Sequence, residues 1–320
     1  MKRVIFSMLI TFMGIATGYA QQIAVVSSDG GTKMYQTLAD AIGGAASGSV
    51  IYLPGGGFQI SNDVKITKKV SIIGIGHKAV SENADGNTVI SGDLYFNDGS
   101  DGSAVMGCYI SGAVYIGYDN TAVDNILVKL CNLSNIYVYS SKCTGTIVNQ
   151  NYIRSISYFG YASAEFTNNI ANGVHRLNGG TISNNILTSR STNSSYYCIR
   201  DCSNNTISNN IYIGSYSLNY NCLVSNNMSL SNSWGDDPIK LDAESWDEVF
   251  VNYNNGTISP ASDFHFKGKY TQYSDCGIYG GTGFDKEALP PVPYIVSKNI
   301  ATQTNAAGML EIKVRVKAGE

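Results

Sequence analysis

The sequence predicts an all-β protein folded as a right-handed parallel β-helix, with a short N-terminal capping helix and a C-terminal β-hairpin. The first observation is a repeated phrase, since Thr181–Ile186 returns as Thr206–Ile211 twenty-five residues later. The second is a turn residue, Gly or Asn, that recurs at intervals of 16 to 25 residues between Gly74 and Asn227. A constant phrase separated by loops of variable length is typical of a solenoid in which each repeat forms one coil.

The distribution of proline supports the same architecture. No proline occurs between Pro54 and Pro238, and a residue without an N–H group would interrupt the hydrogen bonds between coils. The repeated phrase also predicts that Ile182 and Ile207 lie on adjacent coils and face inward. Asparagine tolerates left-handed backbone and can hydrogen-bond along a stack, so the recurring asparagines are expected to line one corner. This predicted corner column consists of Asn169, Asn185, Asn210 and Asn227.

Residues 1–20 are typical of a cleaved secretory signal. Lys2 and Arg3 precede a mostly apolar run, and a small residue, Ala20, ends the segment. We therefore expect an exported protein, located in the periplasm, at the cell surface or outside the cell. No later stretch is long and apolar enough to cross a bilayer, so no transmembrane segment is expected in the mature chain. The mature chain is acidic and has no basic block, which argues against nucleic acid as a partner.

The mature chain divides into three expected parts. Residues 21–49 form an N-terminal cap, because Thr37–Asp40 matches a helix capping box. Residues 50–288 form the β-helix, whose coils are expected to continue to about Phe266. Residues 289–320 contain a Pro-rich linker and then a β-hairpin. In the second arm of this hairpin, apolar and charged residues alternate, which predicts a strand with one buried face.

Two segments resemble a known superfamily. Met34–Gly76, which includes Tyr35-Gln36-Thr37-Leu38, resembles the opening of the pectate-lyase-like right-handed parallel β-helix proteins. Ser259–Gly277, with Asp263-Phe264-His265-Phe266, is similar to the closing coil of exported β-helix proteins of Bacteroidetes. The resemblance implies the fold and contact with polysaccharide. It implies no particular reaction, because the superfamily contains lyases, hydrolases, esterases and adhesins.

The densest group of ionisable residues on the repeats gives the first candidate site. If Val174–Leu177 stacks on Ile199–Cys202, His175 lies beside Arg200, and Arg176 lies beside Asp201. Such a group could bind an acidic polysaccharide, with arginine as a carboxylate clamp or as a base. The alternative is an exposed ion pair with only a structural role. The candidate substrate-binding residues are Arg154, His175, Arg176, Arg190, Arg200 and Asp201.

Six acidic residues between positions 236 and 248 give the second candidate. Clusters of carboxylates can hold Ca²⁺, and lyases of the resembled superfamily use this ion. The predicted metal ligands are Asp236, Asp237 and Asp242. A charged, solvated loop is the alternative, because no EF-hand loop is present. No cofactor other than a possible Ca²⁺ is indicated.

The sequence also predicts the positions or roles of several other side chains. Tyr95 and Tyr115 occupy the same place in two repeats and should stack, either as a surface for sugars or as ordinary strand residues. Cys108 and Cys131 should likewise lie on neighbouring coils, with or without a disulfide. His265, near the end of the repeats, is expected to be a structural residue, as is His77.

The leading functional hypothesis is an exported β-helix protein that interacts with polysaccharide at or outside the cell envelope. A Ca²⁺-assisted polysaccharide lyase with an arginine or lysine base is the second hypothesis. A structural or adhesive surface protein without enzymatic activity is the third.

Overall fold

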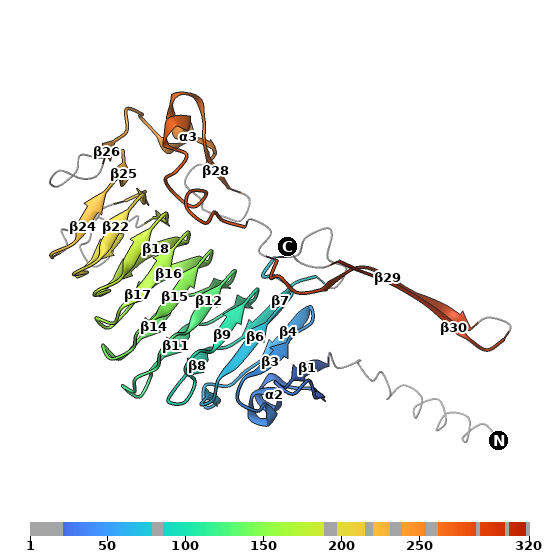
Figure 1. The fold of residues 1–320 in the computed structure, drawn as a ribbon. Helices are drawn as coiled ribbons and strands as arrows, with labels where there is room; N and C mark the ends of the chain where they lie inside the picture. The colour runs from blue at the N-terminus through green and yellow to red at the C-terminus, as the bar shows by residue number, and fades with distance from the viewer. Residues whose placement is uncertain are drawn as a thin grey trace, which may run out of the picture.

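A computed structural model describes residues 22–78, 86–188, 197–214, 220–230, 239–253, 262–285, 289–304 and 307–317. The predicted signal peptide lies outside these residues, and so do Arg190, Asp236 and Asp237. The described chain is dominated by β-strands that form two long sheets along one body (Figure 1). None of the helices within the described residues is long and apolar enough to cross a membrane.

The first sheet has 11 strands, and from β3 onward each strand pairs in parallel with the next. At its N-terminal end, β1 pairs antiparallel with both β2 and β3. The strands are β1 (Ile23–Val26), β2 (Thr32–Tyr35), β3 (Ser49–Tyr52), β6 (Val70–Ile73), β9 (Ala104–Met106), β12 (Leu127–Lys129), β15 (Thr146–Asn149), β17 (Ala164–Thr167), β19 (Thr181–Ser183), β22 (Thr206–Ser208) and β24 (Leu223–Ser225).

The second sheet has 15 strands in two rows, which merge where β16 (Tyr152–Tyr158) and β18 (Ile170–His175) run through both. The first row contains β4 (Gly56–Gln59), β7 (Thr88–Ser91), β10 (Tyr109–Ile110), β13 (Asn132–Leu133), β20 (Ile186–Leu187), β23 (Ile211–Tyr212), β25 (Met228–Ser229) and β26 (Ile239–Lys240). The second row contains β5 (Lys65–Ile66), β8 (Leu94–Phe96), β11 (Val114–Ile116), β14 (Ile136–Val138) and β21 (Ile199–Arg200). The chain visits the first sheet and then the second in turn, and we call each such passage a coil. This arrangement is consistent with a parallel β-helix.

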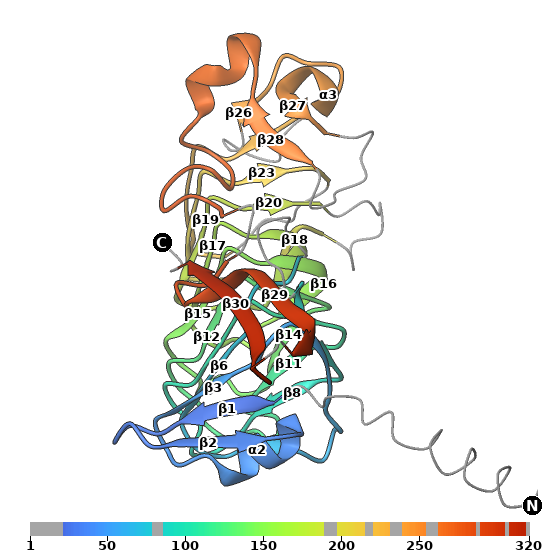
Figure 2. The ribbon, with the colours of Figure 1, turned by 90° about the vertical axis from the view of Figure 1, so that its right-hand side faces the viewer.

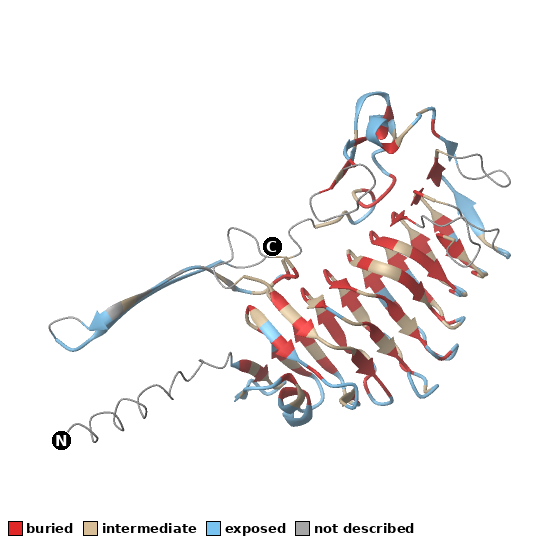
Figure 3. Ribbon diagram, turned by 180° about the vertical axis from the view of Figure 1, so that it is seen from behind, coloured by how far each residue is buried: buried red, intermediate tan, exposed pale blue. Residues whose placement is uncertain are grey.

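Aliphatic side chains stack inside the body at the same position of successive coils. Ile182 pairs with Ile207, and both are almost completely buried, as the repeated phrase predicts. The same inward column of the first sheet continues toward the N-terminal end and forms a large part of the core (Figure 3). Burying each such side chain contributes about 1.5–3 kcal/mol. The column before Ile182 consists of Ile51, Ile72, Val105, Val128, Val148 and Phe166.

The predicted asparagine column is confirmed. The side chain of Asn169 donates to Asn185 Oδ1, that of Asn185 donates to Asn210, and that of Asn210 donates to Asn227. Asn151 extends the column by one more coil. In each pair of adjacent asparagines, it is the preceding residue that has left-handed backbone, with φ between 53° and 57° at positions 168, 184, 209 and 226. The first asparagine of each pair therefore forms the turn at the corner, and the second forms the ladder of side-chain hydrogen bonds between coils.

The N-terminal end of the sheets is covered by helix α2 (Leu38–Gly44), as Figure 1 shows. Thr37 is its N-cap, and the Oγ1 atom of Thr37 accepts a hydrogen bond of 3.1 Å from the backbone N–H of Asp40. This is the bond that a capping residue supplies to an otherwise unpaired N–H group. Leu38, Ala41 and Ile42 are buried, so the apolar side of the helix packs on the first coils.

The C-terminal end differs from the predicted continuation of coils to Phe266. Within the described part of the chain, the last parallel pairing joins β25 and β26. Helix α3 (Trp246–Val249) follows, and β27 (Phe250–Asn252) and β28 (Asp263–Phe266) pair antiparallel with each other, apart from the long sheets. Phe250 packs on Trp246 and Phe264, with ring centroids 5.4 Å apart in both pairs. An aromatic core separate from the main one therefore replaces the expected closing coil, and Figure 2 shows α3, β27 and β28 at this end of the body.

Helix α3 and the β27–β28 pair form a C-terminal cap. After this cap, residues 275–285 return along the outside of the second sheet. Ala171 and Leu187 belong to the main core, so Ile170 and Ile186, each one residue earlier, point to the opposite face. The returning segment covers that face, and a Cβ atom added at Gly277 would lie 2.5 Å from Ile211 Cδ1. Corner asparagines hold the segment, since Asn168 and Asn184 donate to its backbone carbonyls at 2.7 Å.

The C-terminal hairpin consists of β29 (Tyr294–Thr304) and β30 (Leu310–Lys317), paired antiparallel. The expectation of a half-buried second arm is wrong, because all eight residues of β30 are exposed. The two-stranded ribbon extends away from the body (Figure 1), so β30 has no sheet to pack against. Alternation of apolar and polar residues defines two faces of a strand, but it does not supply a surface to cover one of them.

Cys108 and Cys131 lie on neighbouring coils, since Tyr109 pairs with Asn132 directly after them. Both side chains are fully buried, and both thiols are free. Burial raises the pKa of Cys131 to about 12 and also raises that of Cys108. These two thiols therefore stay protonated and serve as small core side chains.

Candidate functional site

Four tyrosines occupy the same position on successive coils of the second sheet. Tyr95 pairs with Tyr115, Tyr115 with Tyr137, and Tyr137 with Tyr158. Each follows a buried residue of its strand, an aliphatic one for the first three and Ser157 for Tyr158, and alternation along the strand turns the tyrosine to the outer face. We call Tyr95, Tyr115, Tyr137 and Tyr158 the tyrosine column.

The rings of the tyrosine column are stacked face to face. Ring centroids are separated by 4.6, 5.2 and 5.6 Å along the column, with interplanar angles of 9°, 10° and 5°. Each stacked pair contributes about 0.5–1.5 kcal/mol beyond the burial of its surface. Because neighbouring rings cover each other's faces, the column presents ring edges and hydroxyl groups along its outer side.

Two further tyrosines lie against these edges and are largely open to solvent. Tyr118 is 42 % exposed and Tyr139 is 45 % exposed. The Tyr118 ring stands at 85° to Tyr95 and at 79° to Tyr115, with centroids 5.2 and 5.8 Å away. Tyr139 lies 5.1 Å from Tyr118 and 5.9 Å from Tyr115. We call Tyr118 and Tyr139 the tyrosine platform, because both rings lie against the column and reach solvent.

A lysine closes the N-terminal end of the tyrosine column. Lys65 pairs with Tyr95, and Lys65 Nζ lies 3.3 Å from the centroid of the Tyr95 ring and 4.8 Å from that of Tyr118. This is a cation–π arrangement. The Tyr95 hydroxyl donates to Asp93 Oδ2 at 3.4 Å, and the other carboxylate oxygen of Asp93 accepts the Ala113 N–H at 2.8 Å.

Three phenols of the site, those of Tyr95, Tyr115 and Tyr139, stay protonated at neutral pH. Burial, followed by the charge of Asp93, raises the pKa of Tyr115 to about 12. The same two causes raise the pKa of Tyr95, and burial raises that of Tyr139. A protonated phenol both donates and accepts hydrogen bonds. The site therefore combines aromatic surface with a row of neutral hydroxyl groups.

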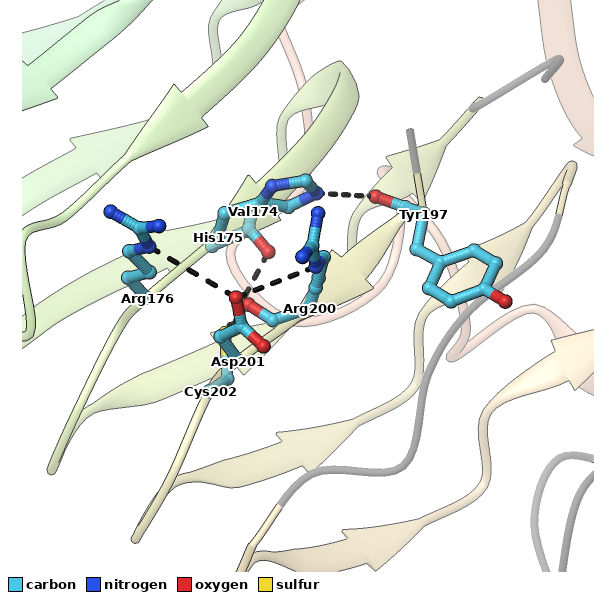
Figure 4. Close-up of polar contacts among 7 residues, drawn as sticks. All are labelled: Val174, His175, Arg176, Tyr197, Arg200, Asp201 and Cys202. Carbon is cyan, nitrogen blue, oxygen red and sulfur yellow. Dashed lines mark hydrogen bonds and ion pairs between the residues drawn. The ribbon is translucent and has the colours of Figure 1, made fainter. Parts of the chain in front are cut away.

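The C-terminal end of the column meets the predicted ionisable group (Figure 4). The predicted register is confirmed, because Val174 pairs with Ile199 and His175 pairs with Arg200. His175 in turn pairs with Tyr158, so the group continues the tyrosine column. Asp201 Oδ2 lies 3.4 Å from Arg200 Nε and 4.0 Å from Arg176 Nε.

His175 lies beside Arg200 as predicted, but its side chain is buried and does not reach a ligand at the surface. His175 is 2 % exposed, and its ring lies edge-on to Tyr158 at a centroid distance of 5.3 Å. His175 Nε2 lies 2.7 Å from the carbonyl oxygen of Tyr197, which only accepts, so Nε2 carries the proton (Figure 4). Burial lowers the pKa of His175, and the charge of Arg200 acts in the same direction. His175 therefore supports the end of the column, and Arg176, Arg200 and Asp201 remain at the surface.

Arg154 lies apart from that group. Its guanidinium donates to Asn132 Oδ1 at 2.6 Å and to the carbonyl oxygens of Ile110 and Ser111 at 3.1 and 2.9 Å. It also lies over the Tyr109 ring, 4.9 Å from the centroid. Arg154 thus bridges three coils and acts as a structural brace. The fourth predicted arginine, Arg190, is outside the described residues.

The predicted calcium site is represented by Asp242 alone, since Asp236 and Asp237 are not described. Asp242 Oδ2 lies 3.0 Å from Lys269 Nζ, and this bond lowers the pKa of the carboxyl group. Within the described ranges, no group of three or more His, Cys, Asp or Glu side chains could hold a metal ion.

Sequence reasoning found Tyr95 and Tyr115 but missed Tyr137, Tyr118, Tyr139 and Lys65. One available signal was the triplet of a tyrosine between two aliphatic or aromatic residues. It recurs as Leu94–Phe96, Val114–Ile116 and Ile136–Val138. The platform tyrosines follow their strands at different offsets, so no repeat marks them.

The comparisons with known proteins gave no match. No protein-family model, curated protein or solved structure is significantly similar to the chain. The geometry of the chain itself is therefore the basis for inferring a function.

Proposed function

We propose that the chain is an exported right-handed β-helix protein of the pectate-lyase-like kind, and that it binds polysaccharide at or outside the cell envelope. The observation that carries the proposal is the stacked tyrosine column with its exposed platform, Tyr118 and Tyr139. The proposed export rests on the signal-like residues 1–20.

The chemistry of the site suits a sugar chain. A pyranose has an apolar C–H face, which packs on an exposed aromatic ring such as Tyr118. Its hydroxyl groups need donors and acceptors, and neutral phenols supply both. The tyrosine column repeats once per coil, at 4.6 to 5.6 Å between ring centroids. This spacing is close to the length of one pyranose unit, so an extended glycan can make the same contacts on successive coils.

The ends of the column favour a glycan that carries carboxylates. Lys65 lies at one end, and Arg176 and Arg200 share one acidic partner, Asp201, at the other. The C-terminal end therefore keeps an excess of positive charge. A guanidinium group binds a carboxylate through paired hydrogen bonds. An acidic polysaccharide is accordingly the proposed class of ligand.

Substitution of Tyr118 tests the proposed function. The mature protein is expected to bind at least one acidic polysaccharide in affinity electrophoresis and calorimetry, and Tyr118→Ala should weaken this binding about tenfold, because it removes the open aromatic face. Tyr52→Ala is the matched control, since Tyr52 is also exposed and lies in β3 of the first sheet, not on the tyrosine column. Equal effects of the two substitutions, or no binding of any polysaccharide, would contradict the proposal. Release of unsaturated sugar products would favour the lyase hypothesis.

The double substitution Arg176→Ala/Arg200→Ala tests the charge preference. Binding of an acidic polysaccharide should weaken several-fold and lose part of its salt dependence, while binding of a neutral polysaccharide should not change. The melting temperature should stay nearly constant, since exposed ion pairs contribute at most about 1 kcal/mol. The side chains of Arg176, Arg200 and Asp201 are 52 %, 34 % and 40 % exposed. Equal losses with acidic and neutral glycans would argue against a carboxylate clamp.

A further inference from the structure

The C-terminal cap contains a cavity that is separate from the tyrosine column. Its volume is about 260 Å³, and β28 and the segment that follows it form its walls. Phe264, Phe266 and Tyr279 contribute aromatic surface, Thr271 and Ser274 contribute hydroxyl groups, and His265 contributes its imidazole. The β27–β28 pair of this cap lies outside the long sheets.

His265 is held in one orientation although its side chain is 61 % exposed. His265 Nδ1 lies 2.6 Å from Asp263 Oδ1, and the ring stacks on Tyr279 at a centroid distance of 3.8 Å and an angle of 7°. Fixing an exposed side chain costs conformational entropy, so two independent restraints on one imidazole indicate a preorganised group.

The restraints also determine which nitrogen is left for a ligand. A carboxylate only accepts hydrogen bonds, so His265 Nδ1 carries a proton and donates it to Asp263. In the neutral ring, Nε2 is then a hydrogen-bond acceptor. Nε2 has no hydrogen-bond partner among the described residues. Burial raises the pKa of Tyr279 to about 12, so its hydroxyl stays neutral beside Asp263.

We propose that this cavity is a second ligand site that binds a single neutral pyranose unit, with one sugar hydroxyl donating to His265 Nε2. The aromatic walls suit the C–H face of the ring. None of the described residues that line the cavity is a lysine or an arginine, and the nearby carboxylate of Asp263 opposes an anion. The volume lies below the 300 Å³ or so at which pockets for drug-sized molecules begin, so one ring fills it. The proposal does not depend on glycan binding at the tyrosine column.

The full mature chain can be tested by nuclear magnetic resonance with methyl glycosides of glucose, galactose and mannose. At least one glycoside is expected to shift the His265 imidazole signal in a saturable way. His265→Ala should weaken that affinity about tenfold, as measured on the signals of Tyr279. His265→Gln, which keeps an acceptor, should recover part of the loss. Tyr118→Ala should leave the affinity unchanged, which separates this cavity from the tyrosine platform.

Asp263→Ala tests whether the carboxylate positions the imidazole. It should weaken glycoside binding several-fold and change the tautomer-sensitive ¹⁵N shifts of His265, while the melting temperature stays within a few degrees. A merely structural Asp263 would leave the ¹⁵N shifts and the affinity as they are. The proposal is overturned if no glycoside moves the His265 signal up to its solubility limit. It is also overturned if the His265→Ala variant, shown to be folded by its backbone resonances, binds the glycoside as tightly as the natural protein.

Discussion

Replacing Asn185 with alanine is expected to lower the free energy of unfolding by about 4 kcal/mol. The side chain is fully buried, and its Nδ2 donates to the carbonyl oxygens of Phe166 and Ser183 at 2.8 and 3.0 Å. Its Oδ1 accepts the backbone N–H of Asn169 at 2.8 Å. Alanine would leave several buried polar groups without partners, and each of them costs about 1–3 kcal/mol.

Urea titration followed by far-ultraviolet circular dichroism measures this effect. Asn62→Ala is the matched control, because Asn62 is exposed and lies outside the asparagine column. Surface substitutions of this kind change the free energy of unfolding by about 0.5 kcal/mol or less. If Asn185→Ala is no more destabilising than Asn62→Ala, the ladder does not stabilise the coils. A loss of stability confined to the coils around Asn185 would show that the ladder acts locally, since stacked repeats interact mainly with their neighbours.

Acidification is expected to remove about 3 kcal/mol of stability through His77 alone, mostly between pH 6.5 and pH 4. His77 is 7 % exposed, and its Nδ1 has no hydrogen-bond partner among the described residues. Burial is the main cause that lowers the pKa of His77 from 6.5 to about 4. In the folded protein the ring stays neutral down to about pH 4, whereas in the unfolded chain it takes up a proton below pH 6.5. The unfolded state therefore gains protons first, and stability falls as pH decreases.

The variant His77→Leu isolates this contribution, because carboxyl groups also titrate in the same range. The free energy of unfolding at pH 7 and at pH 4.5 should differ less in His77→Leu than in the natural protein. His265→Gln is the control, since the His265 side chain is mostly exposed. A pH dependence that is identical in all three proteins would show that the buried ring takes up its proton without cost.

Much of the fold could be predicted from the sequence, because a parallel stack converts repetition along the chain into vertical contact. Ile182 and Ile207 belong to the same phrase and therefore lie directly above one another. The asparagine column follows for the same reason, and so does the stacking of Tyr95 on Tyr115. In each case the local phrase fixes both the position in the coil and the direction of the side chain.

The sequence could not determine what covers the outer faces and the ends. The pattern in Asp263–Phe266 indicates a strand, but helix α3 redirects the chain so that this strand pairs with β27. The alternation in β30 indicates two faces, yet both are exposed. Whether a segment forms a strand depends largely on residues close to it in the sequence. Which strand it pairs with depends on the distant segments that the fold places beside it.

The candidate site likewise has features that the sequence predicts and features that only the tertiary structure determines. Register alone places His175 beside Arg200, and the sequence predicted that register. Burial of His175 depends on the carbonyl group of Tyr197 and on the ring of Tyr158, which reach it from neighbouring coils. The platform likewise forms where Tyr118 and Tyr139, at unrelated offsets in their repeats, meet across the tyrosine column. The sequence by itself determined which residues stack, and only the tertiary structure decided which of them reach solvent, because exposure depends on contacts between segments that no repeat relates.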